Sequence, residues 1–272
     1  MDLNKYRHKW ENRMVIVAIL VGIAGIFAAV LFVLNRSSIP DWVQAVVVVI
    51  FVTPIITAVM IRYNYWKEVV DSIEVTEKQY PELYRIFLEQ VEKAELGFVP
   101  RLYLKNGNGK LNAFASKNQL DITKGAYVLV YSDMVDTFYD LKNEDTIRFV
   151  LSHELGHIKL GHVHVRRSVL RGILTPFFLN DTFTRAQEYS ADRFAASITN
   201  KIATPALAVL VGGKRNYEQM DVEQYAQNDA RHISKFWVAV VNFRANHAVG
   251  RRRLAAAYQM DKEGWDVHGN ML

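Results

Sequence analysis

The segment His153-Glu154-Leu155-Gly156-His157 decides how this chain folds and what chemistry it can carry. On a helix, two histidines four residues apart project from one face, one turn above the other. Two imidazoles placed in this way can both reach one zinc ion at about 2.0–2.1 Å. Glu154 lies beside them, where a carboxylate can hold a water molecule and take its proton during attack on a carbonyl. The segment therefore predicts one zinc ion per chain and a hydrolytic site.

The surroundings of this segment predict a helix over residues 143–159. Apolar residues recur at helical spacing along it and mark a buried side. They are Ile147, Val150, Leu151, Leu155 and Ile158. Leu155 and Gly156 allow the helix to pack closely beneath the metal. Two surface histidines with an accidental Glu between them are the alternative, and the clear apolar face argues against it.

The third metal ligand has to come from another part of the chain. A metzincin site would need a Gly three residues and a His six residues after His157, but Gly161 and His162 are each displaced by one position. Glu188 is the better candidate, because Glu188 and Asp192 share a helix face through a four-residue spacing. Glu188 can bind zinc while Asp192 accepts a hydrogen bond from the distal nitrogen of a ligand imidazole.

Two apolar runs in the first quarter predict a membrane anchor. Residues 14–34 carry no charge, and residues 43–61 are interrupted only by Gln44, two Thr and Pro54. Roughly 20 apolar residues suffice for a helix to cross the hydrocarbon core. A cleaved signal peptide would normally have a shorter core of about 7–15 residues, and a buried soluble hairpin is the other alternative. We expect two transmembrane helices within an anchor of residues 1–66, followed by a catalytic domain of residues 67–272.

The flanks of the two runs indicate an orientation. Trp10, Trp42, Tyr63 and Trp66 lie at the ends of the runs, where amphipathic rings favour the membrane interface. Lys and Arg residues precede the first run and follow the second, whereas the connecting loop holds only Arg36. By the positive-inside rule both ends are cytoplasmic. The expectation is a multi-pass protein of the cell membrane with a cytoplasmic catalytic domain.

The remaining chain reads as an α+β domain. We expect a helix over residues 81–96, strands near 101–105, 111–115 and 126–131, and mostly helices beyond residue 185. This order predicts a zincin-type, mostly helical domain with a small β-sheet.

Composition excludes several classes of function. The 272 residues contain no cysteine, so neither disulfides nor thiolate metal sites are possible. The net charge of +5 is mild, and basic clusters such as residues 251–253 are short. A nucleic-acid partner is therefore not expected. The expected partners are the lipid bilayer and a protein or peptide substrate, while the oligomeric state stays open.

Four segments resemble the HtpX-like membrane zinc peptidases, a gluzincin family that also contains the CAAX prenyl endopeptidases and the Oma-type proteases. They cover most of the chain after the anchors, and the middle two are the specific ones. The segments are Asn112-Ala113-Phe114-Ala115, His153 to His157, Glu188 to Asp192 with Phe194-Ala195, and Asn246-His247 with Arg253-Leu254.

The resemblance implies roles for the first and last segments. Residues 112–115 would border the cleft and hold an extended substrate by strand pairing. His247 would stabilise the oxyanion, with support from Arg253, although a capping or core histidine is an equal alternative for His247. His162 and His164 are expected to be solvated or to stand behind the ligands.

The chain also departs from that family. The HtpX type has a second pair of membrane helices between the metal helix and the third ligand. Here the interval is residues 158–187, and its most apolar part, residues 169–179, contains Arg171 and Pro176 and is too short to span a bilayer as a helix. This part either belongs to the protein core or touches the membrane surface, and core is the preferred interpretation. Ala248 stands where the family usually has Pro.

The leading hypothesis is a membrane-anchored zinc-dependent endopeptidase, with a possible role in quality control of membrane or misfolded proteins as the resemblance implies. The alternative is a catalytically idle membrane scaffold that binds a peptide or a partner in the cleft. An idle scaffold has no need of a base, so Glu154 between both histidines argues against it.

Overall fold

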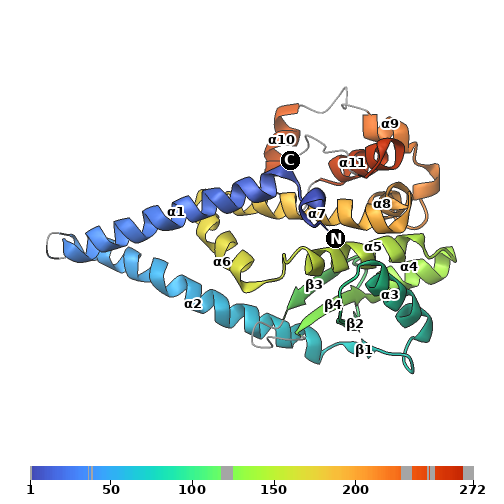
Figure 1. The fold of residues 1–272 in the computed structure, drawn as a ribbon, viewed down its shortest axis with the longest axis horizontal. Coiled ribbons are helices and arrows are strands. Elements are labelled where there is room, and N and C mark those ends of the chain that lie inside the picture. Colours follow the sequence, from blue (N-terminus) through green and yellow to red (C-terminus); the bar gives the residue numbers. More distant parts are fainter. Residues whose placement is uncertain are drawn as a thin grey trace.

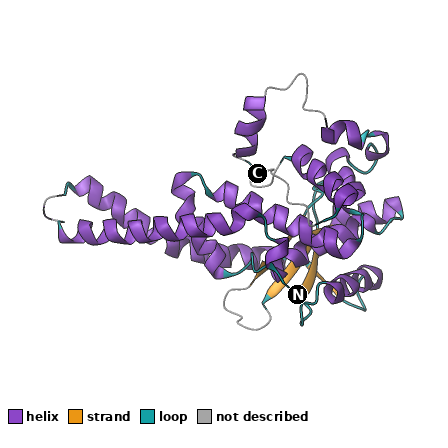
Figure 2. Ribbon diagram, turned by 45° about the horizontal axis from the view of Figure 1, so that its top comes forward, coloured by secondary structure: helices purple, strands orange, loops and turns teal. Residues whose placement is uncertain are grey.

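The computed structural model describes residues 2–35, 37, 39–117, 125–227, 235–243, 245 and 249–265. Within helices α2 and α10 the side chains at a few positions lie outside this description. The chain is mostly helical with one small sheet, so the predicted α+β class is confirmed (Figures 1 and 2).

The sheet has four strands in the order β1-β2-β4-β3. Its strands are β1 (Ile73–Val75), β2 (Arg101–Lys105), β3 (Ala113–Lys117) and β4 (Ala126–Tyr131). β2 and β4 pair in parallel, while β1 and β3 pair antiparallel to their neighbours. β2 and β4 match their predicted bounds, β3 begins two residues later than expected, and β1 was not foreseen. The order leaves β3 at an edge of the sheet.

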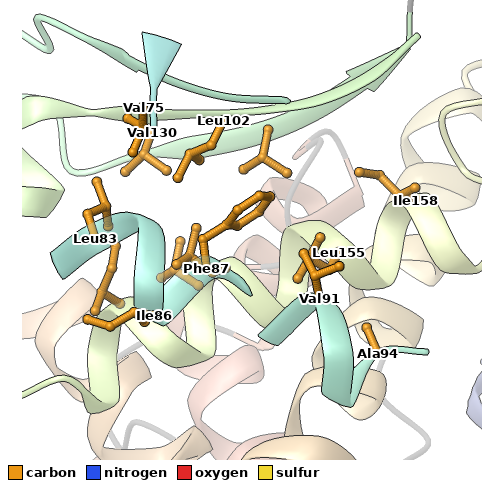
Figure 3. Packing of buried hydrophobic residues seen from close by; sticks show 14 of the residues in the cluster. Val75, Leu83, Ile86, Phe87, Val91, Ala94, Leu102, Val130, Leu155 and Ile158 are labelled. Carbon is orange, nitrogen blue, oxygen red and sulfur yellow. The ribbon is translucent and has the colours of Figure 1, made fainter. Parts of the chain in front are cut away.

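Two amphipathic helices cover one face of this sheet and form the main core. They are α3 (Pro81–Lys93) and α5 (Asp145–Lys159), which contains the His153–His157 segment. Figure 3 shows Phe87 of α3 between Leu102 of the sheet and Leu155 of α5. The apolar face predicted for residues 143–159 is therefore the face that packs against the sheet and α3.

A second core lies on the other side of α5. It is formed by α7 (Asn180–Thr199), α8 (Ala203–Gly212) and α11 (Gly250–Glu263), with Phe149 of α5 inserted between them. α5 thus packs on both sides, and its exposed surface is small. The remaining helical elements are α4 (Ser132–Leu141), α9 (Val222–Gln227), α10 (Lys235–Phe243) and the 3-10 turns η1 (Asn4–Tyr6) and η4 (Tyr217–Gln219).

Two long helices precede the sheet and project from the rest of the chain (Figures 1 and 2). They are α1 (Lys9–Leu34) and α2 (Asp41–Val70). Within the described part of the chain, α1 is the one helix that is long and apolar enough to cross a membrane, and only 6% of its most apolar window is buried. The second predicted span, residues 43–61, lies in α2 and is not established as a span.

The interval between α5 and α7 folds as a short helix followed by a 3-10 turn and is not entirely core. It consists of α6 (Val165–Leu174) and the 3-10 turn η3 (Thr175–Phe177). Leu174 is fully buried against Met14 and Ala18 of α1, but Phe177 and Phe178 are more than half exposed. The expectation that residues 169–179 belong to the core is thus correct only for the side that faces α1.

Candidate metal centre

Close packing of α5 on α7 brings the candidate ligands together. Gly156 faces α7, where an added Cβ would lie 3.0 Å from the Phe194 ring and 3.4 Å from the Ala191 carbonyl oxygen. Any larger residue would push the two helices apart. The absence of a side chain at Gly156 therefore sets the distance between the histidines of α5 and Glu188 of α7.

Three side-chain atoms converge at this contact. The Nε2 atoms of His153 and His157 are 3.1 Å apart, and the Glu188 carboxylate oxygens lie 3.4 Å from each of them. Four ligands held tetrahedrally at about 2.0–2.1 Å from zinc are about 3.4 Å from one another. Among the described residues, His153, His157 and Glu188 have the spacing of a metal site. They offer two imidazoles and one carboxylate. The donor set and its dimensions fit zinc.

The electrostatic environment also favours a cation at this point. Burial by itself lowers the pKa of His153, but the charges and hydrogen bonds of Asp192 and Glu188 prevail and raise it to about 10. Two imidazole nitrogens that face each other cannot both present a lone pair without a positive charge between them. A proton or a metal ion has to occupy this place, and zinc would compete with the proton.

Asp192 holds His153 from behind. Its Oδ1 accepts a hydrogen bond from His153 Nδ1 at 2.8 Å, which leaves Nε2 for the metal. Arg253 donates to the same carboxylate with two nitrogens, at 2.9 Å from Nε and 2.7 Å from Nη2. Although burial raises the pKa of Asp192, the charges of Arg253 and His153 lower it to about 2. Asp192 is therefore ionised at any working pH.

The guanidinium of Arg253 binds the carboxylate of Asp192 with two nitrogens and so orients His153 indirectly. The support of His247 by Arg253, which the resemblance implied, stays a prediction. His247, together with Asn246 and Ala248, lies outside the described residues. The role of His247 at the oxyanion stays a prediction.

His157 has a different partner behind it, and the turn that ends α5 supplies it. Gly161 adopts a left-handed conformation with φ +73° directly after the helix. The His162 amide donates to the His157 carbonyl at 2.9 Å, and the Gly161 amide donates to the Ile158 carbonyl at 3.1 Å. These two bonds define a Schellman motif. The motif folds the chain back, so His162 Nδ1 lies 2.9 Å from His157 Nδ1.

The sequence left two places open for His162, in solvent or behind the candidate ligands, and the structure places it behind His157. It is 4% exposed, and burial lowers its pKa to about 4, so its imidazole is neutral. His164, two residues on, is exposed. The signal that separates them is Gly161-His162 itself, since a glycine just past a helix predicts that the next residue returns to the last turn.

Glu154 lies in the same turn as the ligands and is only 6% exposed. Its charge contributes, with Asp192 and Glu188, to raising the pKa of the buried Arg253 above its usual range against the effect of burial. Glu154 is thus part of a buried group of acidic side chains whose negative charge a divalent cation would offset.

The edge strand β3 runs beside the metal helix. Ala113, Phe114 and Ala115 pair with β4, and the carbonyl of Asn112 accepts a hydrogen bond from the Tyr131 amide at 3.1 Å. β3 contacts α5 directly. Among the described residues β3 has a strand on only one side, so its other edge can offer backbone groups to an extended peptide.

Comparisons with known proteins point to one family. Residues 77–181 match the model of peptidase family M48. The relatives found are named protease HtpX homologs, from Helicobacter pylori strain J99 at 27% identity over 138 residues and from Helicobacter acinonychis at 27% over 136 residues. These matches span about half of this chain and only 41% and 40% of the two relatives. No solved structure matches.

The matched family region contains α5 with both histidines and Glu154, but it ends before Glu188 and Asp192. The third candidate ligand therefore rests on the geometry of α7 alone. The predicted resemblance itself is confirmed: over its central region this chain is similar to the HtpX-like metalloproteases of peptidase family M48.

Proposed function

We propose that this chain is a membrane-anchored zinc endopeptidase. The convergence of His153 Nε2, His157 Nε2 and the Glu188 carboxylate carries this proposal, since the three atoms are spaced as ligands of one ion and leave a fourth position open. Glu154 stands on the same helix turn as a candidate base. One zinc ion per chain would complete the site.

When bound, zinc would supply a Lewis acid that polarises a carbonyl oxygen and makes water more acidic. The side chains have separate tasks. Glu154 takes the proton of the attacking water and later delivers it to the leaving amine. Asp192 keeps the imidazole of His153 in one tautomer. His247 is proposed to hydrogen-bond the carbonyl oxygen as it gains charge.

The substrate would bind as an extended strand along β3. Asn112, Ala113, Phe114 and Ala115 would provide backbone hydrogen bonds, so recognition would depend little on substrate side chains. Loose side-chain preference suits an enzyme that acts on damaged or misfolded proteins, and we propose membrane or misfolded proteins as its substrates. The edge position of β3 beside α5 supports this assignment.

The anchor is proposed to comprise residues 1–66 with spans at 14–34 and 43–61, and the catalytic domain residues 67–272. The apolar helix α1 supports the first span. Both termini would be cytoplasmic. Because the chain has no cysteine, single cysteines at Ser37 and at Lys117 can be labelled from either side of the membrane. Labelling of Ser37 from outside and of Lys117 only from inside is expected, and the reverse pattern would overturn the orientation.

The decisive test of the activity compares wild type with Glu154→Gln. Gln keeps the shape of the side chain but replaces one acceptor oxygen by an NH2 group and cannot take a proton. Cleavage of an unfolded protein such as casein, in the same detergent and with zinc present, should fall by at least about 10²–10⁴-fold. Zinc content, measured by elemental analysis, should stay near one ion per chain in both proteins.

Glu92→Gln is the matched control, because Glu92 is an exposed residue of α3, and it should cleave as wild type does. Equal rates for wild type and Glu154→Gln would assign the hydrolysis to a contaminant or another site. If neither protein cleaves but both bind peptide equally well, the idle scaffold is the correct function.

A further inference from the structure

The residues just before the apolar part of α1 reach the metal helix. Glu11 lies in the first turn of α1, far from residues 153–188 in sequence. Its side chain is fully buried. A carboxylate in such a place is strongly destabilising unless charges and hydrogen bonds satisfy it. Its neighbours therefore indicate what it is for.

Four groups surround the Glu11 carboxylate, and three of them come from other segments. Arg7 pairs with its Oε1, and Arg167 of α6 lies 3.0 Å from the same oxygen. Ser190 of α7 donates to Oε2 at 2.7 Å. The fourth group is His162, whose Nε2 lies 3.4 Å from Oε2. Glu11 thus connects the anchor to α6, to α7 and to the turn that ends α5.

The contact with His162 is long, and His162 Nε2 makes no hydrogen bond of good geometry. Glu11 is nevertheless the acceptor that this buried nitrogen faces. The carboxylate therefore directs the Nε2–H tautomer of His162, because the alternative would set a lone pair against a negative charge.

The tautomer of His162 determines that of His157. With hydrogen on Nε2, the Nδ1 atom of His162 is an acceptor, and it lies 2.9 Å from His157 Nδ1. His157 then donates from Nδ1 and keeps its Nε2 lone pair for the metal. The contacts run from His157 to His162 by a hydrogen bond and from His162 to the Glu11 carboxylate at 3.4 Å, and every group is buried or half-buried.

We propose that Glu11 is a positioning residue of the metal centre, acting through His162 to orient His157. This inference rests on the proposed zinc site, and it makes the anchor helix part of the support of that site. The segment is held firmly in place, since Arg193 of α7 donates to the carbonyls of Tyr6 at 3.2 Å and Lys5 at 2.8 Å. Arg7 also donates to the Leu160 carbonyl at 2.6 Å, at the end of α5.

The test is the affinity of the full-length protein in detergent for zinc, measured by competition with a chromophoric chelator. Glu11→Gln keeps the volume of the side chain but removes the charge that directs the His162 proton. Loss of an outer partner of a ligand histidine typically costs about 10–100-fold in metal affinity, and we expect about 10-fold here because Glu11 acts through one more residue. Cobalt(II) bound in place of zinc should show a changed visible spectrum, which reports ligand geometry directly.

A double-mutant cycle separates positioning from general stability. His162→Gln alone should lower zinc affinity by at least as much as Glu11→Gln does. In the His162→Gln background, Glu11→Gln should cause no further loss, because the intermediate group is gone. Two multiplying losses would mean that Glu11 only stabilises the fold, and the inference would be wrong.

The matched control is Glu68→Gln in α2, the second long N-terminal helix. It removes a half-buried carboxylate that pairs with Lys105 of β2 at 2.9 Å. It should bind zinc as wild type does. Wild-type affinity in Glu11→Gln would overturn the inference while leaving the proposed function intact, whereas a wild type that binds no zinc would overturn the proposed function. If Glu11→Gln does not fold, the inference is tested with His162→Gln alone. Unchanged zinc affinity and an unchanged cobalt spectrum in that variant would overturn the inference.

Discussion

The two ligand histidines lie one turn apart on α5, yet the chain supports them in opposite ways. His153 is held by a carboxylate directly, and Asp192 with its partner Arg253 comes from α7 and α11. His157 is held by a neutral imidazole, and the carboxylate behind it, Glu11, comes from α1. The two candidate ligands are therefore supported from two different parts of the chain.

The physical difference lies in the charge of the group that contacts each histidine, since the two distances are 2.8 Å and 2.9 Å. Asp192 presents an ionised oxygen at 2.8 Å from the ligand ring, so its effect on His153 is electrostatic as well as orienting. His162 carries no charge and can only orient His157. The loss of zinc affinity and the pH dependence of stability should therefore differ between variants that remove one support and variants that remove the other.

The largest effect is expected where a ligand itself is removed. His153→Ala, His157→Ala and Glu188→Ala each leave two protein ligands, too few for a stable zinc site. Elemental analysis of detergent-purified protein should find no retained zinc in any of them, and casein cleavage should be at background. Full zinc occupancy in Glu188→Ala would show that another group supplies the third ligand.

Removal of the direct support should be the next largest effect. Asp192→Asn keeps a hydrogen-bond acceptor near His153 but removes the charge, and zinc affinity should fall by about 10–100-fold. The loss should exceed that of Glu11→Gln measured by the same chelator competition. A smaller loss in Asp192→Asn than in Glu11→Gln would reverse the comparison between the two supports.

A smaller effect is expected from the helix contact that both ligands share. In Gly156→Ala the added Cβ would meet Phe194 at 3.0 Å and the Ala191 carbonyl at 3.4 Å. Separation of α5 from α7 should lower the free energy of unfolding by about 1–3 kcal/mol. Thermal unfolding of zinc-free protein checks the stability, and zinc affinity should also fall because Glu188 moves away. Wild-type stability would mean that Phe194 yields without moving the helices.

A dependence on pH is expected on the His153 side. In zinc-free protein the pKa of His153 is raised from 6.5 to about 10. A raised pKa contributes stability that is complete below 6.5 and is lost as the pH rises toward 10. The free energy of unfolding in chelator should therefore fall with rising pH in wild type and fall less in Asp192→Asn. Parallel curves would show that Asp192 does not hold the proton.

Zinc should change this dependence in the opposite direction. Because the ion and the proton compete for the same Nε2 atom, the stabilisation by added zinc should increase as the pH rises through the same range. The measurement is the difference in unfolding temperature with zinc and with chelator at each pH. A difference that does not vary with pH would argue against shared use of that nitrogen.

Local patterns were sufficient to predict much of the fold. The bounds of β2 and β4, the helix around residues 145–159 and the apolar α1 follow from periodicity and turn signals that act over a few residues. β1 was missed because three residues are too few to show a period. The sequence left open whether residues 169–179 are core or surface, because composition alone does not distinguish a core segment from one that packs on one side of an apolar helix.

For the site, the sequence by itself determined the chemistry of α5 and the pairing of Glu188 with Asp192, because spacing along a helix places side chains on a common face. Only the tertiary structure decided which groups stand behind them. Arg253 binds Asp192, and Glu11 meets His162 across more than half the chain. Such contacts depend on how α1, α6, α7 and α11 pack around α5, and pairing between buried charges follows from burial that no local pattern encodes.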